Sequence, residues 1–157
     1  MQFMASKKIR RWTMFSVVIV VIGSASLFAC NGNRDGTRPP NATITAMGQS
    51  VLVHPGSYCW GGLCVDGVPN LDQAVSVRLA RGEPMTLRTS ALSHARAVAA
   101  SWRSVDRADA GGQLGVQRNG EWAMLLSEFA NGRWEVDVLV SASGGGDVAY
   151  TFIVDAH

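Results

Sequence analysis

The chain has 157 residues and a formal net charge of +2, with 14 Lys and Arg against 12 Asp and Glu. Four of the basic residues precede Cys30, namely Lys7, Lys8, Arg10 and Arg11, so the rest of the chain carries ten basic and twelve acidic residues. Scattered cations on a net acidic chain exclude a protein that binds the phosphates of nucleic acid. Because no lysine follows Lys8, the same part of the chain excludes Schiff-base chemistry and a lysine general base.

Residues 1–29 have the layout of a secretory signal, because the basic residues are followed by the apolar run 14–27. That run is short for a membrane span, which takes about 20 residues. The motif at 27–30, Leu-Phe-Ala-Cys, resembles the lipobox of bacterial lipoproteins. The resemblance implies that Cys30 becomes the mature N-terminus and carries a diacylglycerol thioether and acyl chains such as palmitate. Such an anchor would hold the protein to a membrane of the bacterial cell envelope, on the extracytoplasmic side.

Three alternatives stay open for this segment. Cys30 is an incidental cysteine behind an ordinary cleaved signal, the apolar run is an uncleaved anchor helix, or Arg10-Arg11 begins a twin-arginine export signal. The cysteine count favours lipidation, because pairing of Cys59 with Cys64 would leave Cys30 as an odd thiol in an oxidising compartment.

Residues 30–41 are predicted to form a flexible tether, because they are rich in Asn, Gly and Pro and almost free of apolar side chains. The segment 31–36 resembles the front of a calcium loop, but Ala42 stands where the closing acidic ligand belongs. We therefore expect no calcium there. The remaining residues 42–157 are enough for one domain with its own core.

The stretch 55–66 is predicted to form a disulfide-closed β-hairpin. A glycine pair supplies the positive φ angles of a tight turn, and the flanking residues favour strands, so Cys59 and Cys64 come within bridging range. Closing so short a ring stabilises the fold by roughly 2 kcal/mol in the loop-closure model. The alternatives are a redox-active pair, whose usual spacing is C-x-x-C, and a zinc site that recruits His54 and one further His.

Apolar residues recur with a period of two along the rest of the domain, which indicates strands. The last pair is the clearest, since the alternating residues of 134–140 face those of 148–154 across a glycine-rich turn. Asn119-Gly120 marks another tight hairpin. Further strands are expected at 75–80, 85–88, 98–102, 113–118 and 122–129. Roughly eight or nine short strands predict an all-β fold, with an antiparallel immunoglobulin-like β-sandwich as its architecture.

The closing strand pair resembles the last two strands of bacterial immunoglobulin-like domains, with Trp-x-Val-x-Val at 134–138 and Val-x-Tyr-x-Phe at 148–152. Together with the lipobox and the run Gly-Ser-Tyr-Cys-Trp at 56–60, it makes the chain resemble small bacterial lipoproteins that carry one such domain. The chain departs from antibody-type domains in lacking their inter-sheet Cys pair. The resemblance implies a fold and a location, and it implies no activity.

Motifs for chemistry are missing from the sequence. There is no G-x-S-x-G, and Ser93 and His94 are sequence neighbours, which is not how a Ser/His pair is usually assembled. Glu135 and Asp137 would share the outer face of one strand, where solubility explains them. We therefore predict a non-enzymatic binding or accessory module with no catalytic residue, no metal and no cofactor.

Trp60 is the candidate partner contact. It lies at the tip of the closed hairpin, where an exposed indole would anchor a protein surface or a sugar ring, and the alternative is that it folds back as a lid on the core. We expect a protein or glycan partner at the cell envelope. The alternative function is an extracellular protease inhibitor that presents the constrained loop between Cys59 and Cys64.

Overall fold

The computed structural model describes residues 38–67, 71–107, 109–126 and 128–157. The predicted signal at 1–29, Cys30 and most of the predicted tether lie outside these residues. In the part of the tether that is described, Pro39 is buried, and the carbonyl of Pro40 accepts a hydrogen bond from the Tyr150 hydroxyl at 2.7 Å. Within the described residues, no helix has both the length and the apolar character needed to cross a membrane.

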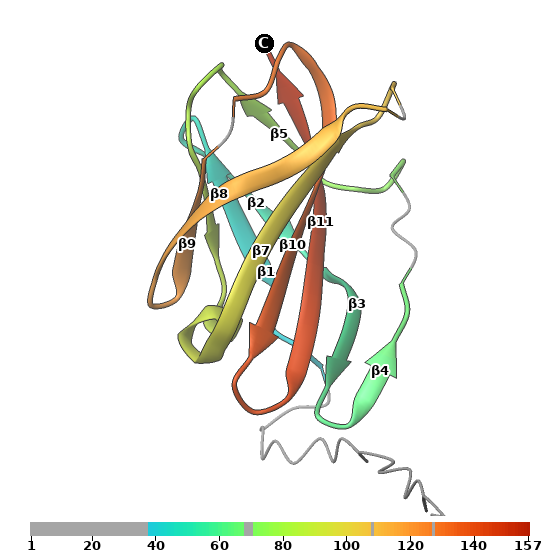
Figure 1. The fold of residues 1–157 in the computed structure, drawn as a ribbon, viewed down its shortest axis with the longest axis vertical. Helices are drawn as coiled ribbons and strands as arrows, with labels where there is room; N and C mark the ends of the chain where they lie inside the picture. The colour runs from blue at the N-terminus through green and yellow to red at the C-terminus, as the bar shows by residue number, and fades with distance from the viewer. Residues whose placement is uncertain (1–37, 68–70, 108, 127) are drawn as a thin grey trace, which may run out of the picture.

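The described residues form eleven strands and one short 3₁₀ helix (Figure 1), which confirms the all-β prediction. The elements, in chain order, are β1 Ala42–Ala46, β2 Gln49–Val53, β3 Pro55–Trp60, β4 Leu63–Val65, β5 Ser76–Leu79, β6 Met85–Arg88, η1 Ser90–His94, β7 Ala95–Ser104, β8 Gly111–Asn119, β9 Trp122–Leu126, β10 Gly132–Ala142 and β11 Gly146–Ala156. Ten of the strands form one hydrogen-bonded path in the order β2-β1-β6-β9-β8-β7-β10-β11-β3-β4, and every neighbouring pair on it is antiparallel.

The sheet curls into a half-barrel because the two parts of β8 pair with different strands. Its first part, up to Leu114, pairs with β7, and its second part, from Gly115 onward, pairs with β9. Strand β5 lies off the main path and pairs in parallel with β11, opposite residues 153–156. The two halves of the curled sheet therefore face one another, with β1, β2, β6 and β9 on one side and β7, β10 and β11 on the other (Figure 1).

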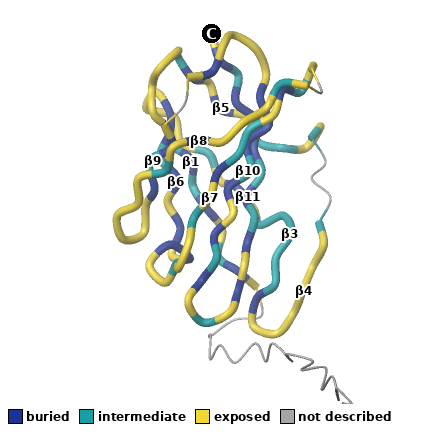
Figure 2. Tube along the Cα trace, in the orientation of Figure 1, coloured by how far each residue is buried: buried dark blue, intermediate teal, exposed yellow. Residues whose placement is uncertain are grey.

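The core fills the concave side of this sheet (Figure 2). In β10, the alternating residues Val136, Val138 and Val140 are fully buried, and they pair with equally buried residues of β11, as the period of two predicted. Fully burying a side chain of this size stabilises the fold by about 1.5–3 kcal/mol. Leu139, which interrupts the alternation in the sequence, points outward and is 45% exposed.

Two features of the fold went unrecognised in the sequence. The hairpin of β1 and β2 turns at Met47 and Gly48, which both have positive φ angles, 49° and 73°. Such angles suit a two-residue turn, but Met is an unusual residue for one, so the turn has no clear sequence signal. The parallel pairing of β5 with β11 joins residues far apart in the chain, and local periodicity says nothing about it.

Candidate binding face around Trp122

The β3–β4 hairpin is closed as predicted. Cys59 and Cys64 are directly opposite one another in the register, with their Cα atoms 4.0 Å apart, and a disulfide joins them. Gly61 and Gly62 form the turn with φ angles of 56° and 85°, values that cost glycine little and suit a tight hairpin. Because both sulfurs are in the bond, neither is available as a thiolate for zinc.

Trp60 lies in the core and not at an exposed tip, which corrects its assignment as a partner contact. Tyr58 pairs with the buried Val148 of β11 and faces the core, so Trp60, two residues further along the strand, faces the same way. The Trp60 side chain is 8% exposed and belongs to the core cluster. This position matches the alternative for Trp60, in which its side chain folds back over the core.

The exposed tryptophan of the described chain is Trp122, in the hairpin that joins β8 to β9. Asn119 pairs with Trp122 across a two-residue turn of Gly120 and Glu121, one residue later than the predicted Asn119-Gly120 turn, and Gly120 has a φ of 58°. Along β9, Ala123 and Leu125 are fully buried, so Trp122 and Met124, which alternate with them, point outward. Trp122 is 37% exposed.

The side chains around Trp122 form two rows across five strands, from β2 through β1, β6 and β9 to β8. Registers between neighbouring strands place these outward residues side by side. The first row is Leu52, Thr43, Arg88, Trp122 and Asn119, and the second is Ser50, Thr45, Thr86, Met124 and Gln117. We call these ten residues, with Gly120 and Glu121 of the turn, the Trp122 face.

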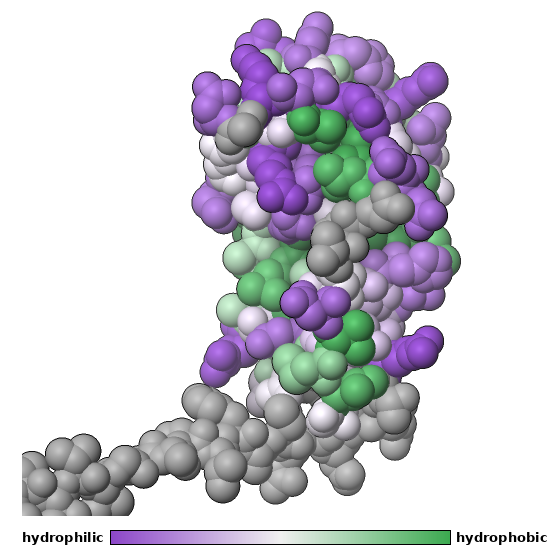
Figure 3. All heavy atoms as spheres, turned by 90° about the vertical axis from the view of Figure 1, so that its right-hand side faces the viewer, coloured by the Kyte–Doolittle hydropathy of each residue, from purple (hydrophilic) through white to green (hydrophobic). Residues whose placement is uncertain are grey.

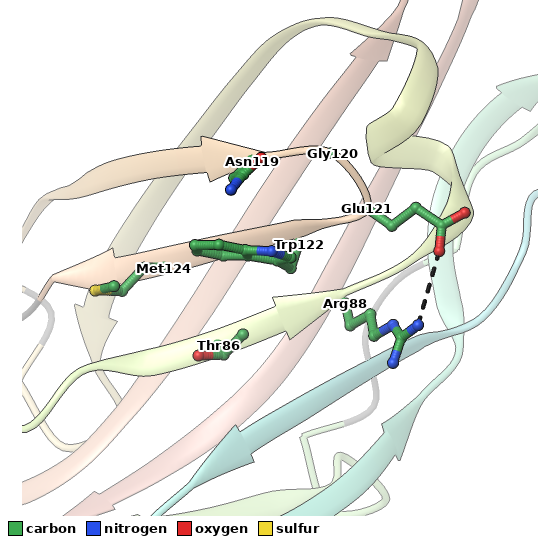
Figure 4. Close-up of a pocket in the computed structure, with 7 residues that line it drawn as sticks. All are labelled: Thr86, Arg88, Asn119, Gly120, Glu121, Trp122 and Met124. Carbon is green, nitrogen blue, oxygen red and sulfur yellow. Dashed lines mark ion pairs between the residues drawn. The ribbon is translucent and has the colours of Figure 1, made fainter.

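A shallow hollow of about 690 Å³ lies on this face, lined by residues of β6, β8, β9 and the turn (Figure 4). Ligand sites commonly have volumes of roughly 300–1,000 Å³. In Figure 4, the indole of Trp122 lies between the side chains of Asn119 and Thr86, next to Met124. The hollow therefore combines a flat aromatic surface with amide and hydroxyl groups.

Charge on the Trp122 face is balanced. Arg88 is its sole cation, and its guanidinium lies 3.9 Å from the carboxylate of Glu121. Both side chains are well exposed, so the pair adds little stability, but it leaves the face without a net charge. The remaining polar groups are hydroxyls and amides, which both donate and accept hydrogen bonds.

The other described tryptophans are packed against protein groups. Trp134 stacks on Phe129 with ring centroids 5.8 Å apart, and its indole N–H donates to the carbonyl of Ala130. Trp102 meets the Trp134 ring edge-on at 4.9 Å. Among the described residues, the Trp122 indole makes no hydrogen bond and no ring contact, so its polar edge and its ring are left for solvent or a ligand.

A second hollow, of about 400 Å³, lies over the disulfide on the opposite half of the sheet. Cys59, Cys64 and Leu139 line it, together with Asp66 and Asp147. Leu63 and Val65 of the edge strand β4 are also exposed, at 44% and 37%. On the side of the molecule that carries β3 and β4, apolar and polar side chains are interspersed (Figure 3). The polar groups that line this hollow include the Ser57 hydroxyl and the two carboxylates, so a polar ligand there would meet anionic side chains.

The buried polar side chains Tyr150 and Glu135 have hydrogen-bond partners within the fold. Burial raises the pKa of Tyr150 to about 12, and its hydroxyl lies 3.2 Å from that of Thr89. Glu135, expected on a solvated face, is 2% exposed and accepts two hydrogen bonds from the Arg103 guanidinium, at 2.8 and 2.5 Å. This contact, more than the Coulomb attraction, raises the pKa of Arg103.

In the described parts of the chain, no three His, Cys, Asp or Glu side chains are grouped so that they could hold a metal ion. Neither a protein-family model nor a curated protein matches the chain in sequence. The Trp122 face can act on another molecule through stacking and hydrogen bonding.

Proposed function

We propose that the chain is a lipid-anchored, extracytoplasmic binding module with an immunoglobulin-like fold, which acts without catalysis through the Trp122 face. The strand order supports the immunoglobulin-like assignment. The order β1-β6-β9-β8 corresponds to the A-B-E-D sheet of such domains, and β7-β10-β11 corresponds to C-F-G. In this assignment, β2, β3 and β4 are additions between the first strand and β5.

The disulfide supports a location outside the cytoplasm. Bonds of this kind form and persist in oxidising compartments, where a free surface thiol would be a reactive exception. Two of the three cysteines are used in the hairpin, and lipid on Cys30 would account for the third. A diacylglycerol group with a further acyl chain gives lasting membrane attachment, which a single chain does not.

The observation that carries the binding role is the exposure of Trp122 without a partner in the described chain. Exposed tryptophans beside hydrogen-bonding side chains are frequent anchors of binding surfaces, since they bury a large area at a low cost in conformational entropy. The alternative function, a protease inhibitor that presents the Cys59–Cys64 loop, has less support. Gly61 and Gly62 form a tight two-residue turn, whereas peptide-binding grooves often take an extended segment.

The experiment combines membrane fractionation with capture on intact cells. We expect the wild type and Trp122→Ala to sediment with membranes and Cys30→Ala to appear in the soluble or released fraction. A photo-crosslinker at Leu126, which is exposed next to Met124 and lies outside the two rows, should capture an envelope component in the otherwise wild-type protein and lose it in Trp122→Ala. Continued membrane attachment of Cys30→Ala would refute the anchor, and equal capture by both proteins would refute the binding face.

A further inference from the structure

We propose that the Trp122 face binds a neutral oligosaccharide, with one sugar ring stacked on the Trp122 indole. The inference rests on the proposed role of this face as the binding surface, and it names the chemistry of the ligand. It is drawn from the kind of groups on the face, their registers and their charge.

Stacking is the first part of the argument. The face of an indole ring carries negative charge density, which attracts the weakly positive C–H groups on one side of a pyranose ring. Trp122 is 37% exposed, and its ring is not engaged by any other aromatic residue of the described chain. A sugar ring is flat enough to lie against it within the hollow of about 690 Å³.

The polar groups beside the indole form the second part. Asn119 is the cross-strand neighbour of Trp122, and Gln117 is that of Met124, so two amides stand in line on β8. On the other side of β9, Thr86 contributes a hydroxyl (Figure 4). Amides and hydroxyls both donate and accept, which matches sugar hydroxyls that do the same. A sugar stacked on the indole is therefore within reach of polar groups on both sides.

Charge decides what kind of sugar fits. Across the ten residues of the two rows, Arg88 is the sole charged side chain, and Glu121 of the turn lies against it. An acidic polysaccharide would meet no unpaired cation on this face, and a cationic one would meet no unpaired anion. The balance therefore favours a ligand without formal charge.

A protein partner fits the same face less well. Stable protein interfaces bury about 800 Å² on each side around a continuous apolar centre. The outward apolar side chains of β9, Trp122, Met124 and Leu126, form a strip one strand wide. The polar side chains of β6 and β1, namely Arg88, Thr86, Thr43 and Thr45, separate this strip from Leu52. The strip is too narrow for such a centre, whereas one indole is sufficient for one sugar ring.

The test is a titration of the full-length protein in a detergent that has no sugar headgroup. The probes are cellohexaose, N-acetylchitohexaose and mannohexaose, with polygalacturonate as the charged counterpart, and calorimetry and Trp fluorescence are the readouts. We expect at least one neutral hexasaccharide to bind with a Kd of about 10 μM to 1 mM. Pelleting with purified cell-wall glycan distinguishes a polymeric source of the ligand from a soluble one.

Variants assign the binding to the face. Trp122→Ala should weaken it at least tenfold, Asn119→Ala and Gln117→Ala several-fold, and Trp122→Tyr much less, because a flat ring is kept. Leu139→Ala changes an exposed apolar residue on the other half of the sheet and should bind like the wild type. Binding to none of the neutral probes and not to wall glycan, binding to polygalacturonate alone, or equal binding by Trp122→Ala would overturn the inference. Those results would leave the fractionation of Cys30→Ala unchanged, so failure here is distinct from failure of the anchor.

Discussion

Trp60 and Trp122 both stand next to a two-residue turn of a β-hairpin, yet one is in the core and the other is on the surface. Trp60 has a disulfide beside it, and a hairpin closed in this way predicts a rigid exposed anchor at its tip. The position of each residue in the two-residue alternation of its strand determines the outcome. Trp60 shares a face with Tyr58, opposite buried Val148, whereas Trp122 shares a face with Asn119.

The comparison teaches that a turn does not itself expose a side chain. A cross-strand partner is a better guide, because residues directly opposite one another lie on the same face of the sheet. Asn119 and Gln117 are polar and belong on the solvent side, so a two-residue turn at Asn119-Gly120 or at Gly120-Glu121 would place Trp122 outside, opposite one of them. The signal for Trp122 was thus present in the sequence, in the strand preceding it.

The largest expected effect separates the two tryptophans by stability. Trp60→Ala should lower the free energy of unfolding by about 3–4 kcal/mol, because it leaves a cavity beside Tyr58 in the core. Trp122→Ala should lower it by less than about 1 kcal/mol, since much of that ring is already in water. Urea titration followed by circular dichroism measures both. Equal losses in the two variants would contradict the difference in burial.

The ion pairs on the two halves of the sheet should also differ in how much they stabilise the fold, because one contains a buried carboxylate and the other is exposed. Arg103→Ala should cost about 2–3 kcal/mol, because the buried carboxylate of Glu135 loses the guanidinium that it bonds. Arg88→Ala should cost less than about 0.5 kcal/mol, since both members of the Arg88–Glu121 pair are exposed. Thermal unfolding at matched ionic strength gives the two losses in free energy of unfolding. A loss for Arg88→Ala as large as that for Arg103→Ala would show that the Trp122 face contributes to the stability of the fold.

Alkaline pH should lower the stability of the fold through the buried residue Tyr150. The folded state raises the pKa of Tyr150 to about 12, above an unfolded value of about 10, so the neutral phenol is favoured by folding. Its stabilising contribution is complete below pH 10 and is lost as the pH rises toward 12, by about 2–3 kcal/mol in all. Unfolding measured between pH 9 and 12 should show this decrease in the wild type and a smaller one in Tyr150→Phe. Identical profiles would show that another group is responsible.

The disulfide should have a moderate effect and leave the Trp122 face unchanged. Replacing both Cys59 and Cys64 with Ala should cost about 2 kcal/mol, the value for so short a ring. The exposure of Trp122 should stay the same, because the hairpin of β3 and β4 lies at the other end of the strand order. Unfolding curves test the first expectation, and the rate at which hydroxyl radicals oxidise Trp122, read by mass spectrometry, tests the second. A changed rate at Trp122 would connect the two regions.

Local patterns in the sequence predicted the elements that depend on neighbours in the chain. The β10–β11 pair followed from alternation, the β3–β4 hairpin from its glycines and cysteines, and the β8–β9 hairpin from Asn119-Gly120. Features that depend on contacts between distant parts of the chain could not be predicted from local patterns. The parallel pairing of β5 with β11 and the burial of Glu135 by Arg103 depend on how distant strands come together.

Trp122 itself was harder to predict because both faces of β9 are apolar. The sequence Trp-Ala-Met-Leu-Leu offers a core face in either alternation, and only the register with β8 selects Ala123 and Leu125 as the buried pair. Trp60 was also ambiguous, since its apolar neighbours in the sequence were consistent with either an exposed hairpin tip or a lid on the core. Pairing information resolves both cases, and composition resolves neither.

The most direct measurement of the central claim is the oxidation of each tryptophan by hydroxyl radicals, with the sites read by mass spectrometry. The account predicts that Trp122 is oxidised several-fold faster than Trp60 and Trp134, and that a bound neutral hexasaccharide protects Trp122 alone. Oxidation of Trp60 at the rate of Trp122, or a Trp122 that is protected in the free protein, would contradict it.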